Sequence, residues 1–440
     1  MLRDELSDRR IGLADCNNFF CSCERRICPE LEGRPVVVLS GNDGCIISRS
    51  NEVKAMCVQM GAPFFKYREL LAYHGVAIRS ANHRIYQGIS SEVMAVIRSY
   101  TDCQEIYSID ESFFNLAIPT ISDPFSYCEK LRQEIWRRCR IPISIGIAPT
   151  KTLAKLGTEY AKKHRETNGV LWMDKSRYKS AGFMSAFPCR DVWGIGPKMA
   201  ESLSRAGISN VAQFAAREDT WIKDKYNMPG LYTAWELRGF SVNPVQNKRR
   251  PQQSIMVSRS FGEPITTFSG VLDALISFTV SAAAQMRRAG LSAGKMEVYV
   301  ATNRFGNDYY AMGKDFVFHE PETLDGTFIK IATELLKQIY TDGRQYKKCG
   351  VILSNLSNVS LGRQTNLFAD EACERRRAAM TVIDRLNNEG KRPVLKPAVL
   401  CERPDSEKNW KSKSEFKTDE KTLQNSPVEA TRFQSHAEDF

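Results

Sequence analysis

Two adjacent carboxylates interrupt a stretch of apolar and β-prone residues at 105–113, which reads EIYSIDESF. On a regular strand, successive side chains point to opposite faces, so Asp110 and Glu111 would be separated and one of them buried. A buried carboxylate without a partner is costly. The strand must therefore break here, either in a simple turn or at a point where both acids converge on a cation.

A hairpin accommodates both acids. Residues 105–110 and 112–116 are expected to form its two strands, with a sharp turn at Asp110 and Glu111 that places both side chains at one sheet edge. Asp15 ends another short strand, residues 10–15. If that strand lies beside 105–110, three carboxylates meet at one point, and such hard oxygen ligands suit Mg²⁺. Taken alone, these three residues are better explained as ordinary turn and strand-end acids.

Basic residues elsewhere in the sequence favour the interpretation of these acids as a cation site. Lys151 and Lys155 follow an alternating strand at 141–148 and share one face of the helix that begins there. A triphosphate beside metal-bound acids needs such cations, and the N-terminus of a helix adds a favourable field. Arg49 and Lys54 are further candidates from a separate segment. For any single lysine, a solvated helix face is the simpler interpretation.

The rest of the chain divides into two mixed blocks and a tail. Residues 1–172 form an α/β unit, and residues 255–355 form a compact α+β domain. Short helices fill 185–215, and the polar, proline-flanked segment 244–254 is typical of a linker. From about residue 357 the apolar content falls, and the last forty residues are expected to be disordered apart from docking peptides.

Composition restricts the partners and the compartment. The net charge of +11 and a pI near 9.0 favour a polyanionic partner. We find no signal pattern and no apolar run long enough to span a bilayer, so we expect a soluble, cytoplasmic protein with no membrane partner. The 13 cysteines include no CxxC pair and the five histidines are scattered, which favours free thiols over disulfides or zinc.

A glycine pair marks a second candidate site. The sequence WGIGPK at 193–198 is followed by a helix and fits a helix–hairpin–helix element. In such an element, Gly194 and Gly196 let backbone amides approach a DNA phosphate, with Lys198 beside them, without reading the base sequence. An ordinary pair of packed helices explains the motif equally well.

Taken together, these motifs resemble the Y-family translesion DNA polymerases, and in particular the UmuC type, the catalytic subunit of bacterial DNA polymerase V. The resemblance extends over about residues 10–400 in unbroken order, so it is far more specific than any single motif. It rests on LADCNNFFCSCE (13–24), RPVVVLSGNDGCIISR (34–49), YSIDE (107–111), GIAPTKTLAK (146–155) and VWGIG (192–196).

The resemblance implies roles for individual residues. Asp15, Asp110 and Glu111 match the family's metal ligands for two Mg²⁺ ions, and Asp110 and Glu111 are the catalytic pair. Phe20 falls on the steric-gate position, which leaves no room for a 2′-hydroxyl on the incoming nucleotide, and Phe19 lies beside it. Two lysines match the residues that hold the triphosphate, Lys54 and Lys155.

The family architecture is a right hand with a ferredoxin-like palm, small fingers, a helical thumb and an α+β little finger. It implies the following division: palm 1–18 and 86–172, fingers 19–85, thumb with helix–hairpin–helix 173–245, linker 246–253, little finger 254–356 and a low-complexity tail 357–440. We expect the thumb glycines and three linker cations, Lys248, Arg249 and Arg250, to contact phosphates of primer–template DNA.

The sequence departs from the family pattern at three positions. Asn51 stands where many relatives carry a tyrosine near the triphosphate, Cys57 stands where glycine is usual after the fingers helix, and Gly157 replaces a more usual alanine. None of these changes removes a metal ligand, so we expect an active enzyme.

A short peptide in the tail resembles the clamp-docking motif of such polymerases. It reads RQTNLF at 363–368, and Gln364, Leu367 and Phe368 would fill pockets of a sliding clamp. The family also implies a processed UmuD-type dimer and a recombinase filament as partners, although no residue identifies either.

The expected activity is error-prone, template-directed synthesis past DNA lesions in the SOS damage response, using deoxynucleoside triphosphates. Two alternatives remain. One is a non-enzymatic DNA-binding relative of the fold, which the intact carboxylate set disfavours. The other is a nucleotide cyclase with a palm-like carboxylate pair, which has no need of a thumb, little finger or clamp peptide.

Overall fold

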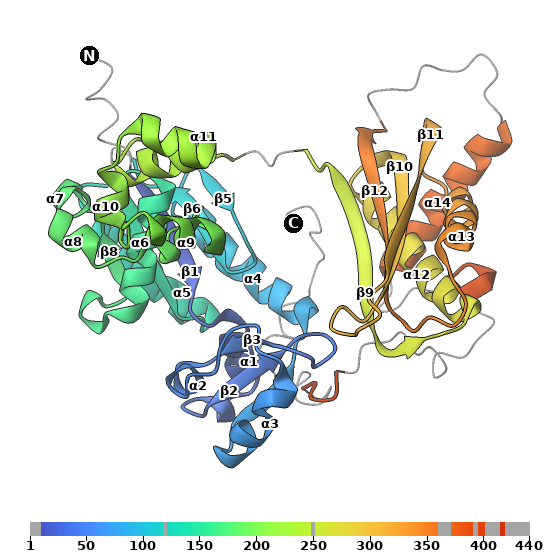
Figure 1. Cartoon of the computed structure of the whole chain (residues 1–440), viewed down its shortest axis with the longest axis horizontal. Helices are drawn as coiled ribbons and strands as arrows, with labels where there is room; N and C mark the ends of the chain where they lie inside the picture. Colours follow the sequence, from blue (N-terminus) through green and yellow to red (C-terminus); the bar gives the residue numbers. More distant parts are fainter. Residues whose placement is uncertain are drawn as a thin grey trace. The chain divides into compact units, whose positions relative to one another are not determined.

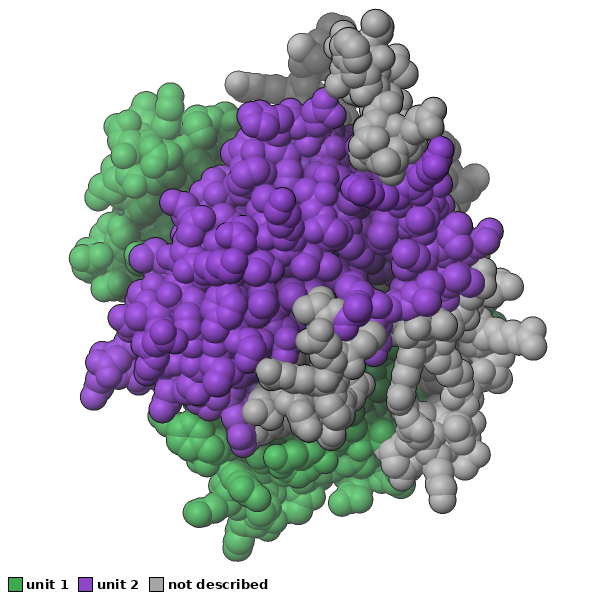
Figure 2. All heavy atoms as spheres, turned by 90° about the vertical axis from the view of Figure 1, so that its right-hand side faces the viewer, with its two compact units in different colours: residues 1–249, 415–440 green, residues 250–414 purple. Residues whose placement is uncertain are grey.

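The chain forms two compact units with separate cores. The computed structural model describes residues 10–117, 121–247, 251–359, 371–389, 395–400 and 414–418. Unit 1 comprises Met1–Arg249 and Glu415–Phe440, and unit 2 comprises Arg250–Ser414; Figure 2 distinguishes them by colour. This organisation of helices and sheets confirms the expected α+β multidomain class.

A five-stranded sheet forms the centre of unit 1. Its order is β5-β6-β1-β7-β8, and the fully buried β1 is antiparallel to both β6 and β7. The strands are β1 (Ile11–Cys16), β5 (Gln104–Ile106), β6 (Glu111–Asn115), β7 (Ile143–Ala148) and β8 (Val170–Trp172).

The expected hairpin forms, but two of its details were wrong. The strand beside β1 is β6, not the strand 105–110. The turn also takes four residues, 107–110, because β5 already ends at Ile106. Asp110 therefore lies in the turn, whereas Glu111 is the first residue of a strand.

Helices cover the two faces of this sheet (Figure 1). α4 (His83–Arg98) and α5 (Pro124–Cys139) share a core with Ala14, Cys16 and Phe114, and α6 (Lys151–Lys163) shares a second core with Leu13 and Phe113. Alternation along β1 and β6 thus assigns odd-numbered residues to the α6 face.

Two glycines allow α6 to approach the sheet closely. A Cβ at Gly146 would lie 2.0 Å from the Ala154 carbonyl oxygen, and a Cβ at Gly157 would lie 3.0 Å from Met173 Cγ and 3.4 Å from Gly146 Cα. Gly157, where alanine is more usual in the family, therefore faces Gly146 across a tight contact.

A small subdomain is inserted between β1 and α4, and we call residues 29–80 the insertion. Its three-stranded sheet has the order β3-β2-β4, with β2 antiparallel to β3 and parallel to β4. α1 precedes it. The elements are α1 (Phe19–Ile27), η2 (Pro29–Leu31), β2 (Val36–Leu39), β3 (Ile46–Arg49), α2 (Asn51–Ala55), α3 (Phe64–Tyr73) and β4 (Ala77–Ser80).

Helices after α6, most of them short, complete the α6-side core. Val192, Ile195, Leu203 and Leu231 pack there. The elements are η3 (Arg165–Thr167), α7 (Lys175–Lys179), α8 (Ala181–Ser185), η4 (Cys189–Asp191), α9 (Pro197–Arg205), α10 (Val211–Ala215) and α11 (Asp219–Leu237).

Unit 2 is a four-stranded antiparallel sheet of order β11-β10-β12-β9 with α12 and α13 packed on it. The elements are β9 (Ser254–Ile265), α12 (Phe268–Arg288), β10 (Leu291–Thr302), β11 (Ala311–Glu322), α13 (Asp325–Ile339), β12 (Tyr346–Asn358), α14 (Glu371–Glu389) and η5 (Ala398–Leu400).

Two elements of unit 2 were not predicted. The edge strand β11 has no buried residue, so its sequence lacks the apolar alternation of a half-buried strand. α14 lies in the low-complexity tail, before the last forty residues that were expected to be disordered. Its Asp384 forms an ion pair with Arg287 of α12, with 2.6 Å between Nε and Oδ2.

Among the described residues, α12 is the one helix that is long and apolar enough to cross a membrane, judged by length and composition only. However, the side of α12 that carries Val271, Leu275, Phe278 and Met286 is buried in the core of unit 2. A helix packed in this way is a core element.

Candidate active site

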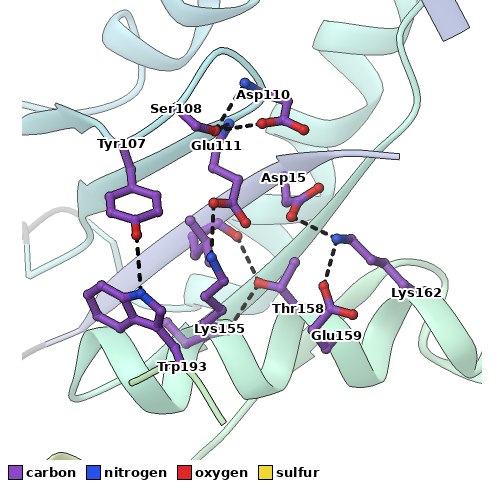
Figure 3. Close-up of polar contacts among 12 residues, drawn as sticks. Asp15, Tyr107, Ser108, Asp110, Glu111, Lys155, Thr158, Glu159, Lys162 and Trp193 are labelled. Atoms are coloured by element: carbon purple, nitrogen blue, oxygen red, sulfur yellow. Dashed lines mark hydrogen bonds and ion pairs between the residues drawn. The ribbon is translucent and has the colours of Figure 1, made fainter. Parts of the chain in front are cut away.

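Strand register brings two carboxylates to one end of the central sheet. Asp15 of β1 is paired with Glu111 of β6, two residues from the pair Leu13 and Phe113. All four residues therefore lie on the face covered by α6. Figure 3 shows the Asp15 and Glu111 side chains at this end, with Asp110 beside them.

The turn that carries Asp110 is held by a serine. Ser108 Oγ donates to Asp110 Oδ1 at 2.5 Å and accepts from the backbone N–H of Glu111 at 3.0 Å. The Asp110 carbonyl oxygen accepts from the N–H of Cys16 at 2.9 Å. The turn is thereby fixed against the end of β1, and Ser108 is a positioning residue that the sequence analysis missed.

Asp15 is nearly buried, with 6% of its surface exposed, and Lys162 of α6 lies against it. The distance from Lys162 Nζ to Asp15 Oδ2 is 2.7 Å. Burial and a hydrogen bond with the neighbouring Glu111 raise the pKa of Asp15, against the opposing effect of Lys162. Burial disfavours the charge on Lys162, but Asp15 and Glu159 together raise its pKa.

Lys162 and Glu159 are site residues that the sequence analysis did not identify. Lys162 Nζ donates to Glu159 Oε1 at 2.7 Å as well as to Asp15. The available signal was spacing, because Lys155, Glu159 and Lys162 follow one another at helical intervals along one face of α6. Figure 3 shows all three pointing toward the carboxylates.

Lys155 contacts the second carboxylate, as its predicted position near the metal ligands requires. Its Nζ lies 2.9 Å from Glu111 Oε2 and 5.0 Å from the centre of the Tyr107 ring. Trp193 Nε1 donates to Tyr107 Oη at 3.1 Å. Two aromatic residues therefore fix the lysine that faces Glu111.

Lys151 does not join this group. It is buried, and its Nζ donates to both carboxylate oxygens of Glu105 at 2.6 Å. Glu105 also accepts from the backbone N–H of Gln246 at 2.8 Å. The structure gives the expected phosphate role of Lys151 no support, because this lysine ties the start of α6 to Glu105 of β5, which also holds the segment after α11.

Lys54 of α2 is a cation without an ionic partner among the described residues. Partial burial lowers its pKa, and the like charges of Arg49 and Lys162 lower it further. The guanidinium of Arg49 donates to the Val58 carbonyl oxygen. Lys54 of the insertion therefore lies near Lys162 of α6, and positive charge from both elements suits a polyanionic ligand.

The two adjacent phenylalanines of α1 have different environments. Phe19 is buried in the core, whereas Phe20 is half-buried and stacks on Tyr86 of α4 with 4.8 Å between ring centres. His83 meets Phe20 edge-on at 5.5 Å. Phe20 is therefore the ring that presents an accessible surface.

The structure gives reasons for two of the unusual residues. Asn51 accepts a hydrogen bond from Asn18 Nδ2 at 2.9 Å, so its side chain is engaged within the fold. Cys57 has φ of 59°, a left-handed conformation that explains why glycine is usual there.

The thumb glycines lie in the turn that leads into α9. Gly194 has φ of 94°, and a Cβ there would lie 2.9 Å from Thr233 Oγ1, so this position requires glycine. Gly196 caps α9, which begins at Pro197, and Lys198 is exposed. The predicted DNA contacts of these residues remain predictions.

Six predicted residues lie outside the described part of the chain. They are the linker cations Lys248, Arg249 and Arg250 and the clamp-peptide residues Gln364, Leu367 and Phe368.

The carboxylate set fits a divalent cation, although no preformed cluster of metal-ligating side chains occurs among the described residues. Asp15 and Glu111 each bind a lysine, and Asp110 accepts from a hydroxyl. All three groups are hard oxygen donors at one end of a sheet, and two of them are close enough to repel each other. A cation of charge two relieves that repulsion.

Both halves of the chain match known family models. Residues 14–159 match the impB/mucB/samB family, and residues 252–367 match the impB/mucB/samB family C-terminal domain.

Curated relatives cover nearly the same length. Protein UmuC of Salmonella typhimurium is 34% identical over 382 residues, which is 86% of this chain and 90% of that protein. Protein SamB of the same organism is 32% identical, covering 86% and 91%. DNA polymerase IV of Moorella thermoacetica is 26% identical, covering 89% and 96%.

Solved structures share the fold. A Y-family DNA polymerase chimera of Dbh and Dpo4 superimposes with a TM-score of 0.65 at 21% identity, covering 79% of this chain and 98% of that one. An insertion ternary complex of Dbh DNA polymerase gives 0.55 at 20% identity over the same shares.

The fold is that of a Y-family DNA polymerase. Within that class, the chain belongs to the impB/mucB/samB family, whose members include the UmuC and SamB proteins.

Proposed function

We propose that this protein is a DNA-directed, error-prone translesion polymerase of the SOS damage response. The observation that carries the proposal is the joint position of Asp15, Asp110 and Glu111 at one sheet end, faced by Lys155 and Lys162. Family membership supports the same activity.

The subdomains then take the roles of a polymerase hand. The central sheet is the palm, the insertion with α1 is the fingers, helices α7–α11 are the thumb, and unit 2 is the little finger. The chain would hold primer–template DNA and a deoxynucleoside triphosphate; one structural neighbour is named an insertion ternary complex of Dbh DNA polymerase.

The three carboxylates would hold two Mg²⁺ ions, which lower the pKa of the primer 3′-hydroxyl and stabilise charge on the leaving pyrophosphate. Lys162 and Lys155 neutralise Asp15 and Glu111 in the structure described here. Both lysines are then available to bind the triphosphate when other cations occupy the carboxylates. Lys54 approaches from the insertion without a competing partner among the described residues.

Phe20 would set the choice of sugar. Its exposed ring face, supported by Tyr86 and His83, would pack against the nucleotide sugar and exclude a 2′-hydroxyl. The further partners we propose are a sliding clamp, a processed UmuD-type dimer and a recombinase filament.

A primer-extension assay on undamaged and lesion-containing templates tests this function. We expect Mg²⁺-dependent extension opposite and beyond the lesion. Binding of primer–template DNA without extension would instead favour a non-enzymatic subunit. Release of a cyclic nucleotide without a template would favour a cyclase.

A further inference from the structure

A short segment near the C-terminus lies on the insertion. Residues 415–418 alternate in exposure, with Phe416 and Thr418 half-buried and Glu415 and Lys417 exposed. Glu415 and Phe416 lie in a turn, and the side of the segment that carries Phe416 and Thr418 faces the rest of unit 1. The Phe416 ring packs into the core of the insertion, 5.9 Å from the Phe64 ring and nearly perpendicular to it.

Polar contacts fix the backbone of this segment. The N–H of Ser80, the last residue of β4, donates to the Phe416 carbonyl oxygen at 3.0 Å, and the N–H of Phe416 donates to Ser80 Oγ at 2.9 Å. Asp43 Oδ2 accepts from the N–H of Glu415 at 2.6 Å, and Asp43 Oδ1 accepts from Ser80 Oγ at 2.6 Å. Main-chain pairing with one pocketed aromatic side chain is a common mode of peptide recognition.

Thr418 contacts a buried carboxylate. Its Oγ1 donates to Glu24 Oε2 at 2.8 Å, and Glu24 is 1% exposed. The other oxygen, Oε1, accepts from Tyr86 Oη at 2.5 Å. Arg79 Nε lies 3.8 Å from Oε2, the oxygen that Thr418 binds. Burial raises the pKa of Glu24, and the hydrogen bonds from Tyr86 and Thr418 oppose that rise.

Tyr86 connects this carboxylate to the nucleotide side of the protein. Its ring stacks on Phe20 with an interplanar angle of 21°. One continuous series of contacts therefore runs from Thr418 through Glu24 and Tyr86 to Phe20. Loss of the Thr418 hydroxyl would leave one oxygen of a buried carboxylate without its closest donor, which favours movement of the groups bound to that carboxylate.

We propose that residues 415–418 are an internal ligand of the insertion, and that Thr418 is a positioning residue for the sugar-selecting ring of Phe20. The second part rests on the proposed function of Phe20. The segment acts through Glu24 and Tyr86. It contacts neither the three carboxylates of the candidate metal site nor the proposed nucleotide position.

Hydrogen exchange of the full-length protein tests the docking. Phe416→Ala should speed exchange of the Ser80 amide, because its acceptor leaves with the segment. Lys417→Ala is the matched control, since this side chain is exposed, and it should leave exchange unchanged. An excess of a synthetic peptide of residues 411–420 should restore protection in the Phe416→Ala variant. Equal exchange in wild type and Phe416→Ala would overturn the docking.

Sugar discrimination tests the coupling to Phe20. Thr418→Val keeps the shape of the side chain and removes the hydrogen-bond donor. The ratio of deoxyribonucleotide to ribonucleotide use should then fall by about threefold to tenfold, because only part of the free energy of a hydrogen bond to a charged group is transmitted to Phe20. Thr418→Ser should restore the wild-type ratio.

An unchanged ratio in Thr418→Val, with protection of Ser80 intact, would overturn the positioning role. A wild-type protein that extends no primer would overturn the proposed function and the role of Thr418 in it. Hydrogen exchange of the Ser80 amide tests the docking of residues 415–418 separately, because it does not depend on primer extension.

Discussion

The three carboxylates have different partners, so substitution of each one has a different effect on the site. Asp110 accepts from Ser108 and has no cationic partner among the described contacts, so Asp110→Asn preserves the shape of the turn and removes one negative charge. Loss of one charged ligand should reduce the rate of primer extension by roughly a thousandfold or more.

Single-turnover extension by Asp110→Asn measures this loss. The matched control is Asp224→Asn, at an exposed position of α11, which should extend at the wild-type rate. Near-normal extension by Asp110→Asn would remove this residue from the metal site.

The two phenylalanines of α1 provide their own comparison. Phe20→Ala should raise ribonucleotide use by about tenfold or more, the range in which an apolar pocket discriminates by size. Phe19→Ala should instead lower the free energy of unfolding by about 3–5 kcal/mol, because it opens a cavity in the core.

Parallel extension with each nucleotide type and denaturant unfolding of both variants separate these effects. If Phe19→Ala alone relaxes sugar choice, the gate has been assigned to the wrong ring.

At this scale the sequence predicted the acidic residues better than the basic ones. Acids beside a β-prone stretch are conspicuous because they are costly there unless paired. Lysines on a helix are not, since an exposed lysine carries no cost, so Lys151 and Lys162 could not be assigned correctly. Only the packing of α6 decides which lysine reaches a carboxylate.

Among the elements, α6 depends on a residue distant in sequence. Glu236 of α11 is buried, and its Oε2 accepts from the Thr152 N–H at 3.1 Å in the first turn of α6. Its Oε1 accepts from the N–H groups of Val242 and Asn243 at 2.8 and 3.1 Å. One carboxylate therefore holds both the start of α6 and the segment after α11.

Glu236→Ala should lower the free energy of unfolding by about 3 kcal/mol, since the buried Thr152 N–H and two less buried N–H groups lose a charged acceptor. Glu201→Ala, at an exposed position of α9, should change it by less than about 0.5 kcal/mol. Urea unfolding of both variants measures the difference. Equal stabilities would mean that solvent replaces these hydrogen bonds.

The elements with strong apolar alternation were predicted, and those without it were not. β7 and α13 follow from their patterns, whereas the exposed strand β11 and the polar helix α14 do not. Strand pairing could not be predicted from the sequence either, because the apolar pattern does not specify whether β5 or β6 lies beside β1.

At the scale of the whole molecule, two predictions concern segments outside the described residues. Neutralising Lys248, Arg249 and Arg250 should weaken DNA binding alike on all sequences. It should also flatten the salt dependence by roughly one slope unit per lost phosphate contact. Binding titrations at several salt concentrations measure the slope, and an unaltered slope would place these residues in solvent.

Recruitment to a clamp is the second prediction. Replacing Leu367 and Phe368 with alanine removes two apolar contacts, each contributing about 1.5–3 kcal/mol before ordering costs. Clamp-stimulated synthesis should be lost while extension without a clamp remains. Equal losses with and without the clamp would assign the segment to the fold.

The pairing of Asp15 with Glu111 also determines when the candidate active site can form while the ribosome translates the chain. The ribosome releases Asp15 early, then the whole insertion, and only later β6 and the cations of α6. Until β6 and β7 have emerged, the central strand β1 lacks both neighbours, and until Lys162 has emerged Asp15 lacks its counter-charge. A chain truncated before α6 also lacks β8, so β7 is left with a bare strand edge, which is a template for aggregation. Premature termination of translation would yield an insoluble fragment and no partly active polymerase.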